Sequence, residues 1–318
     1  MEKIFFLFPG QGAQYTGMAL DFLDSGEEKI KNLFELASDV CGRDMKALLR
    51  DSDAETLKRT DISQPAITLA NLAAAAFLEL KFLELKAPEN RPAGCAGFSL
   101  GEYAAFALAG IISMEDCFSL VNQRGKIMQA AVDRMDGTAG MAAVMGLAPE
   151  KVEETASGIK DLYAANFNSP RQTVVSGSAL AEAEPLFISA GAKRFIRLAV
   201  AGPFHSPLMA EAAEEFRPVL EAVSFSDPNV PFYSNVSGKQ VSSGEEAKKL
   251  ALLHITSPVR WLDVETAIAA AGGINCCLEL GPGKVLQGLW RDSPGVALPC
   301  FAAGTADEII NFIEGHKA

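Results

Sequence analysis

The sequence predicts an α/β fold: one large domain with a parallel sheet, into which a small subdomain is inserted. Strand-like and helical segments alternate over residues 1–133 and again over residues 206–318, which is typical of parallel strands joined by helical crossovers. Between these two parts, residues 134–205 follow the order β-α-β-β-α-β of a ferredoxin-like unit. We therefore expect the two outer parts to form one domain around the insertion.

The composition is that of a globular protein and argues against several function classes. The chain has 318 residues, 49% of them apolar, and a net charge of −12. Such a charge argues against nucleic acid as a partner, because binding phosphates requires a positive surface. Six cysteines occur without metal-ligand spacing, so we expect neither a metal site nor a disulfide. Residues 4–8 are too short for a signal peptide, so we expect a cytoplasmic protein.

The first predicted strand, residues 3–8, leads into a glycine-rich loop, residues 9–14. Such a loop offers backbone N–H groups to an anion, but this one lacks the Gly-Lys-Ser/Thr ending of a phosphate-binding loop. A plain turn explains the glycines equally well. Residues 27–86 then show helical periodicity, and their apolar part, residues 65–78, predicts a buried helix too short to span a bilayer.

The pattern Gly-x-Ser-x-Gly at residues 97–101 lies between a short apolar run and a helical segment, residues 100–109. At such a junction the glycines let two backbones approach closely, and the serine Oγ points outward. Ser99 is therefore a candidate nucleophile. The N–H of Leu100, at the free start of the helix, would then stabilise an oxyanion. The alternative interpretation is a tight turn with a solvated serine.

The next helical segment, residues 114–133, places Arg124 beside an apolar face. A guanidinium is costly there unless it is paired. On position alone, we interpret Arg124 as part of a structural ion pair or as a side chain that reaches water.

The remaining predicted elements build the subdomain and then complete the large domain. In the subdomain they are strand 141–147, helix 148–159, strands 162–167 and 172–176, helix 179–190 and strand 193–200. In the large domain they are helix 209–223, strand 230–235, helices 250–255 and 264–271, strand 276–280, a helix ending at residue 289, strand 296–301 and a short C-terminal helix.

A serine nucleophile needs a general base, and the chain has three histidines. His316 lies two residues from the end of the chain, where order is least expected. His254 lies in a helical segment and fits a core position as well as a catalytic one. His205 follows a Gly-Pro turn where the chain leaves the subdomain, so it can project into a cleft between the two parts. We therefore identify His205 as the base.

Seven short blocks carry a resemblance to a known family: residues 8–14, 97–102, 123–125, 168–170, 202–206, 257–261 and 279–284. In content and order they resemble the malonyl-CoA:acyl carrier protein transacylases, over essentially the whole chain. The resemblance implies an α/β-hydrolase-like core with a ferredoxin-like insertion. This architecture agrees with the pattern of strands and helices.

The resemblance also implies roles for the candidate residues. Ser99 is the nucleophile and His205 the base, and the backbone N–H groups of Gln11 and Leu100 form the oxyanion hole. Arg124 would pair with the free carboxylate of a malonyl group, because a planar guanidinium can donate two parallel hydrogen bonds to a carboxylate.

Two positions depart from the family pattern. Phe98 stands where members usually have His, beside the acyl pocket, so it bears on acyl selectivity more than on the chemistry. Phe204, just before the base, is a second candidate wall of that pocket. His254 stands where the family often has Gln. In the family that residue orients the base through its main-chain carbonyl, so another side chain is tolerated.

The implied reaction moves malonyl from malonyl-CoA to the phosphopantetheine thiol of acyl carrier protein, through a malonyl-serine, for fatty acid synthesis. No bound cofactor is expected. One alternative is an acyltransferase that serves a polyketide synthase lacking its own. A serine esterase or thioesterase is a weaker alternative, because the chain lacks a His-Gly-Gly-Gly segment and continues far beyond its base. A non-catalytic module is disfavoured, because Ser99, Arg124 and His205 are all present.

The implied carrier protein is acidic in this family, so docking onto an acidic chain requires a local basic patch. The candidates are Lys193, Arg194 and Arg197, before the base, and Lys284 with Arg291, near the Gly-Pro-Gly turn. We expect no membrane partner and a monomer.

Overall fold

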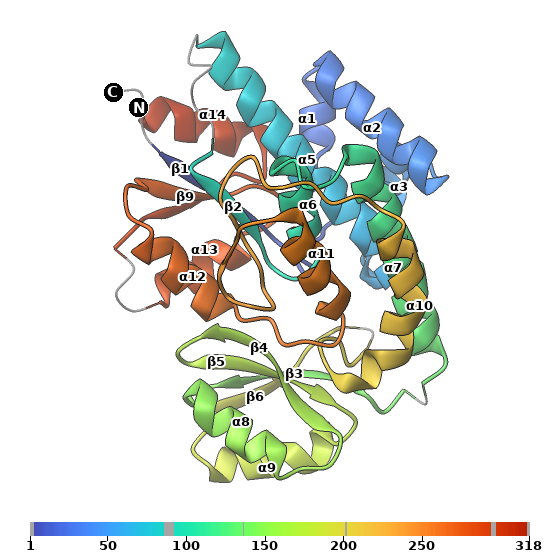
Figure 1. Ribbon diagram of the computed structural model, residues 1–318, viewed down its shortest axis with the longest axis vertical. Helices are drawn as coiled ribbons and strands as arrows, with labels where there is room; N and C mark the ends of the chain where they lie inside the picture. The colour runs from blue at the N-terminus through green and yellow to red at the C-terminus, as the bar shows by residue number, and fades with distance from the viewer. Residues whose placement is uncertain (1–2, 86–91, 136, 201, 294–296, 317–318) are drawn as a thin grey trace.

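The computed structural model describes residues 3–85, 92–135, 137–200, 202–293 and 297–316. It contains a six-stranded sheet, ordered β10-β9-β1-β2-β7-β8, and a four-stranded sheet, ordered β4-β5-β3-β6 (Figure 1). The larger sheet consists of β1 Ile4–Phe8, β2 Gly94–Gly97, β7 Phe232–Tyr233, β8 Gln240–Val241, β9 Cys276–Glu279 and β10 Cys300–Ala302. The predicted α/β class with a parallel sheet is confirmed.

Helices cover both faces of the larger sheet, because its strands are apolar on both sides. Along β1, Ile4, Phe6 and Phe8 pack into one cluster, whereas Phe5 and Leu7 pack into another. This alternation follows from the two-residue period of a strand. The first cluster includes α5 Thr60–Glu84, α6 Gly101–Leu108 and α7 Met114–Asp133; the second includes α12 Trp261–Ala270 and α13 Val285–Arg291.

One edge of the larger sheet differs from the prediction of a wholly parallel sheet. The neighbouring pairs from β10 to β7 are parallel, but β7 and β8 are antiparallel. The predicted strand 230–235 is shortened to β7, Phe232–Tyr233. At Ser234 the chain turns back, and its N–H donates to the carbonyl of Lys239 at 3.0 Å. The prediction was wrong here because a tight reversal replaces a crossover helix.

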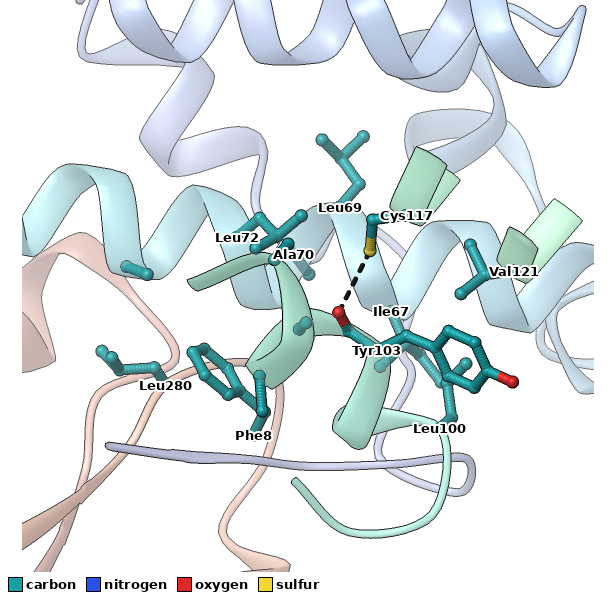
Figure 2. Close-up of a cluster of buried hydrophobic side chains, with 14 of the residues drawn as sticks. Phe8, Ile67, Leu69, Ala70, Leu72, Leu100, Tyr103, Cys117, Val121 and Leu280 are labelled. Atoms are coloured by element: carbon teal, nitrogen blue, oxygen red, sulfur yellow. Dashed lines mark hydrogen bonds between the residues drawn. The ribbon is translucent and has the colours of Figure 1, made fainter. Parts of the chain in front are cut away.

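The predicted buried helix at residues 65–78 is the middle of α5, which has 25 residues. Thr68 and Asn71 interrupt the apolar pattern but are fully buried within the helix. By length and composition α5 could cross a membrane, so the expectation that it is too short was wrong; 67% of its most apolar window is buried in the fold. Figure 2 shows α5 residues packed in one buried cluster with Leu100 and Tyr103.

The helical periodicity predicted over residues 27–86 corresponds to several separate helices. Before α5 the structure has α1 Leu20–Asp24, α2 Glu28–Cys41, α3 Met45–Asp51 and α4 Ala54–Lys58. Asp44 and Asp53 cap α3 and α4 by accepting hydrogen bonds from backbone N–H groups of the first turn. Short capped helices therefore lead into the long central one.

The smaller sheet is antiparallel and follows the element order β3-α8-β4-β5-α9-β6. Ala142 and Val144 of β3 face a cluster with α8 and α9, whereas Met141 and Ala143 pack into the main core. One face of this sheet is therefore turned toward the larger unit (Figure 1). The elements are β3 Gly140–Met145, α8 Pro149–Ser157, β4 Leu162–Ser169, β5 Gln172–Gly177, α9 Leu180–Ser189 and β6 Arg194–Arg197.

The last third of the chain contains α10 Ala210–Glu221, α11 Gly244–Leu253 and α14 Ala306–Gly315. The structure starts α11 at Gly244 rather than at the predicted residue 250. The hydroxyl of Ser243 accepts the N–H of Glu246 at 3.2 Å and so caps the longer helix. The start of the predicted strand 296–301 lies outside the described residues, and β10 begins at Cys300.

Residues 257–261 connect the smaller sheet to the larger unit. Val259 exchanges two 2.8 Å backbone hydrogen bonds with β4, donating to Ala165 and accepting from Phe167. The N–H of Arg260 donates to the carbonyl of Asn235, which follows β7. This segment therefore adds backbone hydrogen bonds to the apolar contacts between the two units.

We predict that Gly101→Ala lowers the free energy of unfolding by roughly 1–3 kcal/mol, the range for overpacking. A Cβ on Gly101 would lie 2.1 Å from the backbone oxygen of Phe8, where neither backbone can move easily. Gly288→Ala, inside α13, is the matched control. No atom lies within 4 Å of its added Cβ, so it should be neutral or stabilising. Guanidinium unfolding curves measure both; equal stabilities would contradict the prediction.

Candidate active site

Ser99 occupies the tight turn between β2 and α6. Its φ is +47°, a left-handed conformation that a non-glycine residue rarely adopts. A Cβ on Gly97 would lie 2.0 Å from the carbonyl carbon of Gly101, so only glycine allows the turn to close this tightly. The sequence pattern and the structure thus agree on a serine at a tight turn beyond the end of β2, where the structure shows it half-buried and lining a cavity.

Asn235 fixes this turn from the neighbouring strand, and the sequence analysis missed it. Its side-chain Oδ1 accepts the N–H of Ser99 at 2.6 Å, and its Nδ2 donates to the carbonyl of Gly97 at 2.6 Å. Glu102, fully buried in α6, accepts in turn from the N–H of Asn235 and the hydroxyl of Ser234. The available signal was a polar residue at the carboxyl end of a strand, where sites form in parallel sheets.

His205 lies directly against the serine. Its Nε2 is 2.7 Å from Ser99 Oγ, and its Nδ1 is 3.1 Å from the carbonyl oxygens of both His254 and Ser257. Carbonyl oxygens only accept, so the proton lies on Nδ1 and Nε2 is free to accept the serine proton. Two main-chain carbonyls therefore orient this base, where a Ser-His-Asp triad uses a carboxylate.

The electrostatic environment keeps His205 neutral. Burial, and after it the positive charge of Arg124, lowers the pKa of His205 from its usual 6.5 to about 4. An imidazole with a lowered pKa is unprotonated at neutral pH and can accept a proton. The other two histidines are placed differently: the ring of His254 is buried beside His205, and His316 stacks on Phe312 in α14.

Arg124 is 2% exposed, inside α7, and its charge meets no carboxylate in direct contact among the described residues. Nη1 donates to Gln64 Oε1 at 2.8 Å, Nη2 lies 3.5 Å from His254 Nδ1, and Nε has no partner among the described residues. The interpretation of Arg124 as a structural ion pair or a water-reaching side chain is therefore wrong. Its guanidinium retains free donors and an uncompensated positive charge.

One cavity of about 560 Å³ brings the predicted residues together. Its lining residues include Gln11, Phe98, Ser99, Arg124, Phe204 and His205. Phe98 packs edge-on against Trp261, with ring centroids 5.4 Å apart, and Phe204 is buried. The cavity thus has an apolar wall, a serine in hydrogen-bond contact with a histidine, and one buried cation.

The backbone N–H groups of Gln11 and Leu100 have no acceptor within the described part of the chain. Leu100 begins the helix that follows Ser99, where N–H groups lack intrahelical partners. The side chain of Gln11 is held by Thr60, through a 3.2 Å hydrogen bond. These free donors beside the serine fit an oxyanion hole. Among the described residues, no group of three or more His, Cys, Asp or Glu side chains could hold a metal ion.

Comparison with known proteins places this site in a family. A model of the acyl transferase domain matches residues 5–293. The chain belongs to the acyl transferase domain family. A malonyl CoA-acyl carrier protein transacylase of Haemophilus influenzae is 38% identical to it, and the match covers 92% of each chain.

Solved structures of relatives match this acyl transferase over nearly its whole length. An acyl carrier protein S-malonyltransferase from Vibrio cholerae has a TM-score of 0.88 and 34% identity, covering 98% of this chain and 99% of the other. A malonyl-transacylase solved in complex with a type II polyketide synthase acyl-carrier protein has a TM-score of 0.89 and 34% identity, covering 99% and 100%. The similarity in sequence and fold thus extends over nearly the full length of these relatives.

We predict that the serine of this acyl transferase stays reactive well below pH 6.5. The rate of inactivation by phenylmethanesulfonyl fluoride should fall only as the pH approaches about 4, because His205 stays unprotonated above its lowered pKa. Rates measured from pH 4 to 8, with His205→Ala as the control, test this. A midpoint at or above 6.5 would contradict the neutral, buried base.

Proposed function

We propose that this enzyme transfers a malonyl group from malonyl-CoA to the phosphopantetheine thiol of acyl carrier protein, for fatty acid synthesis. The observation that carries the proposal is Arg124: a buried guanidinium without a carboxylate partner opens into the cavity that holds Ser99 and His205. Malonyl differs from acetyl by one carboxylate. In a cavity shielded from water, that carboxylate and this guanidinium each compensate the other.

In the first half-reaction, Ser99 Oγ attacks the thioester carbon while His205 Nε2 takes its proton. The N–H groups of Gln11 and Leu100 donate to the developing oxyanion. When the tetrahedral intermediate collapses, the C–S bond breaks and the coenzyme A thiol leaves with the proton from His205. Malonyl remains as an ester of Ser99.

In the second half-reaction, the carrier thiol gives its proton to His205 and attacks the malonyl ester. The ester C–O bond breaks, and Ser99 recovers its proton from the imidazolium. Arg124 also affects the base: its positive charge is one cause of the lowered pKa of His205. A bound malonyl carboxylate offsets that charge, so the pKa of His205 rises when the correct acyl group is present.

For the remaining site residues and for the domain division, we propose what the sequence analysis implied. Phe98 and Phe204 form the walls beside the acyl group, and the His254 carbonyl orients the base. Residues 1–133 and 206–318 form an α/β-hydrolase-like catalytic domain, and residues 134–205 a ferredoxin-like subdomain. The element order β3-α8-β4-β5-α9-β6 and the serine turn after β2 support this division.

A second candidate is malonyl supply to a polyketide synthase that lacks its own acyltransferase. It is favoured by the similarity to the malonyl-transacylase solved with a polyketide carrier protein. The chemistry is the same in both cases, and the carrier protein that docks decides the pathway. We further propose a cytoplasmic monomer that binds no cofactor, with malonyl-CoA as its donor substrate.

We predict that Arg124→Ala lowers kcat/KM for malonyl transfer roughly 30-fold or more, which corresponds to a loss of about 2–5 kcal/mol of binding free energy. Relative use of acetyl-CoA should rise, because an apolar space replaces the guanidinium. In the wild-type enzyme methylmalonyl-CoA should be a modestly poorer donor, since one methyl group is worth about 1–3 kcal/mol. Intact-mass analysis of the acyl-enzyme with the three donors measures this ranking.

Two further variants serve as controls for this ranking. Arg134→Ala removes an exposed arginine that follows the same helix and pairs with Glu215 at 2.9 Å; it should leave the ranking intact. Ser99→Ala should form no adduct with any donor. If Arg124→Ala ranks the three donors as the wild-type enzyme does, Arg124 does not have the proposed role.

We also propose a basic docking surface for the acidic carrier protein. Arg171, Lys193, Arg194 and Arg291 line one cavity of about 600 Å³, between the β4–β5 turn and the end of α13. These four basic side chains form no ion pair within the part of the chain that the structure describes, and one carboxylate, Asp292, lines the same opening. They supply a local attraction that the net charge of −12 does not. Lys284 contributes less than expected from the sequence, because it pairs with Glu308 at 2.9 Å.

We predict that Lys193→Glu combined with Arg291→Glu raises the KM for carrier protein, while KM for malonyl-CoA changes less. The increase should shrink at high salt, because exposed charges are screened. Lys160→Glu is the control. Lys160 carries the same charge but precedes the start of β4, whereas the proposed surface lies near the end of β4. Equal KM values for the two variants would rule out this surface.

A further inference from the structure

The cation in the cavity is held by neutral acceptors. Arg124 Nη1 donates to the amide oxygen of Gln64 at 2.8 Å, and Nη2 lies 3.5 Å from Nδ1 of His254. Neither partner carries a negative charge. The plane of the guanidinium is therefore fixed on this side, while its positive charge remains available to a ligand.

The imidazole of His254 separates Arg124 from Glu102. The His254 ring is 2% exposed and Glu102 is fully buried, with Nε2 and Oε2 3.6 Å apart. Glu102 is thus the carboxyl group that faces this cluster, on the far side of the ring from Arg124. Its other contacts are the backbone N–H of Asn235 and the hydroxyl of Ser234.

Arg124 also fixes the protonation of this ring. A guanidinium only donates, so His254 Nδ1 must be the unprotonated nitrogen that faces it. The single ring proton then lies on Nε2, which points toward the Glu102 carboxyl and has no other partner among the described residues. A second proton on Nδ1 would meet the N–H groups of Arg124. The ring is therefore neutral and oriented, with its acceptor toward the cation and its donor toward the carboxyl.

We propose that the side chain of His254 is a positioning residue: it aims the Arg124 guanidinium into the cavity and keeps Glu102 from neutralising it. This inference rests on the proposed function, in which Arg124 binds an acyl carboxylate. Without the ring, Arg124 and Glu102 would approach and form a buried ion pair. That pair would compete with the substrate for the same donors, and a buried ion pair is not readily broken. Burial raises the pKa of Glu102 to about 8, although its hydrogen bonds and the charge of Arg124 act in the other direction, so the carboxyl is mostly protonated at neutral pH while the ring separates it from the cation. Direct contact with the guanidinium would favour its ionised form.

The test separates the ring of His254 from its main-chain carbonyl, which orients His205 in every variant. His254→Ala should raise the KM for malonyl-CoA roughly 10- to 100-fold, the factor for losing a hydrogen bond to a charged group, with a much smaller change in kcat. His254→Gln should restore most of the affinity, because an amide offers an oxygen to Arg124 and an N–H to Glu102. Leu253→Ala, an exposed neighbour at the end of α11, is the control.

A double variant tests the competition with Glu102 directly. Glu102→Gln added to His254→Ala should lower the KM again, because an amide cannot form the ion pair. An unchanged KM in His254→Ala, a fall in kcat alone, or a double variant no better than His254→Ala would overturn the inference. A purely structural role would not produce this recovery.

Titration with malonate by calorimetry keeps the inference testable by itself. Wild-type enzyme should bind malonate, His254→Ala should bind it more weakly, and the double variant should recover binding. If the wild-type enzyme forms no malonyl-serine, the proposed function fails, and the malonate titration still decides the role of His254. Equal malonate binding by wild type and His254→Ala would overturn the inference even if transfer is normal.

Discussion

Two contacting residues of the candidate site have unfavourable backbone conformations, and the surrounding structure must hold them in place. Ser99 and His205 both have positive φ values, 47° and 56°, which cost roughly 1–2 kcal/mol per residue outside glycine. Such strain persists only where the surroundings enforce it. Around Ser99 they do so through the close packing at Gly101 and the two side-chain hydrogen bonds of Asn235. The parallel pairing of β1, β2 and β7 brings these groups together.

The segment 257–261 connects the surroundings of Ser99 and His205 to the smaller sheet. The carbonyl of Ser257 accepts from His205, Val259 pairs with β4, and the ring of Trp261 packs on Phe98. His205, Phe98 and the smaller sheet are therefore all contacted by alternate residues of one short segment. The substrate cavity lies where the two sheets meet, so movement of one sheet against the other would alter base and wall together.

The charges of the site are arranged around one cation. Burial, and after it the charge of Arg124, lowers the pKa of both His205 and His254, and among the described residues no carboxylate contacts Arg124. Because the interior stabilises an ion poorly, a buried guanidinium of this kind is favourable only when an anion enters. In the proposed function, substrate recognition and the basicity of His205 therefore depend on the same charge.

The sequence by itself predicted the serine turn, the histidine that the structure places against it, and the order of most elements. The glycines around Ser99 and the turn before His205 act through local backbone geometry. The alternation along β1 follows from side-chain direction in a strand. Both kinds of signal can be recognised in a short stretch of sequence. Only the tertiary structure revealed Asn235 behind the serine, and the placement of His254 between Arg124 and Glu102. It also showed the antiparallel β8 and the full length of α5. These features depend on how elements distant in the sequence pack against one another, and no local spacing encodes the direction in which a buried polar side chain finds its partner.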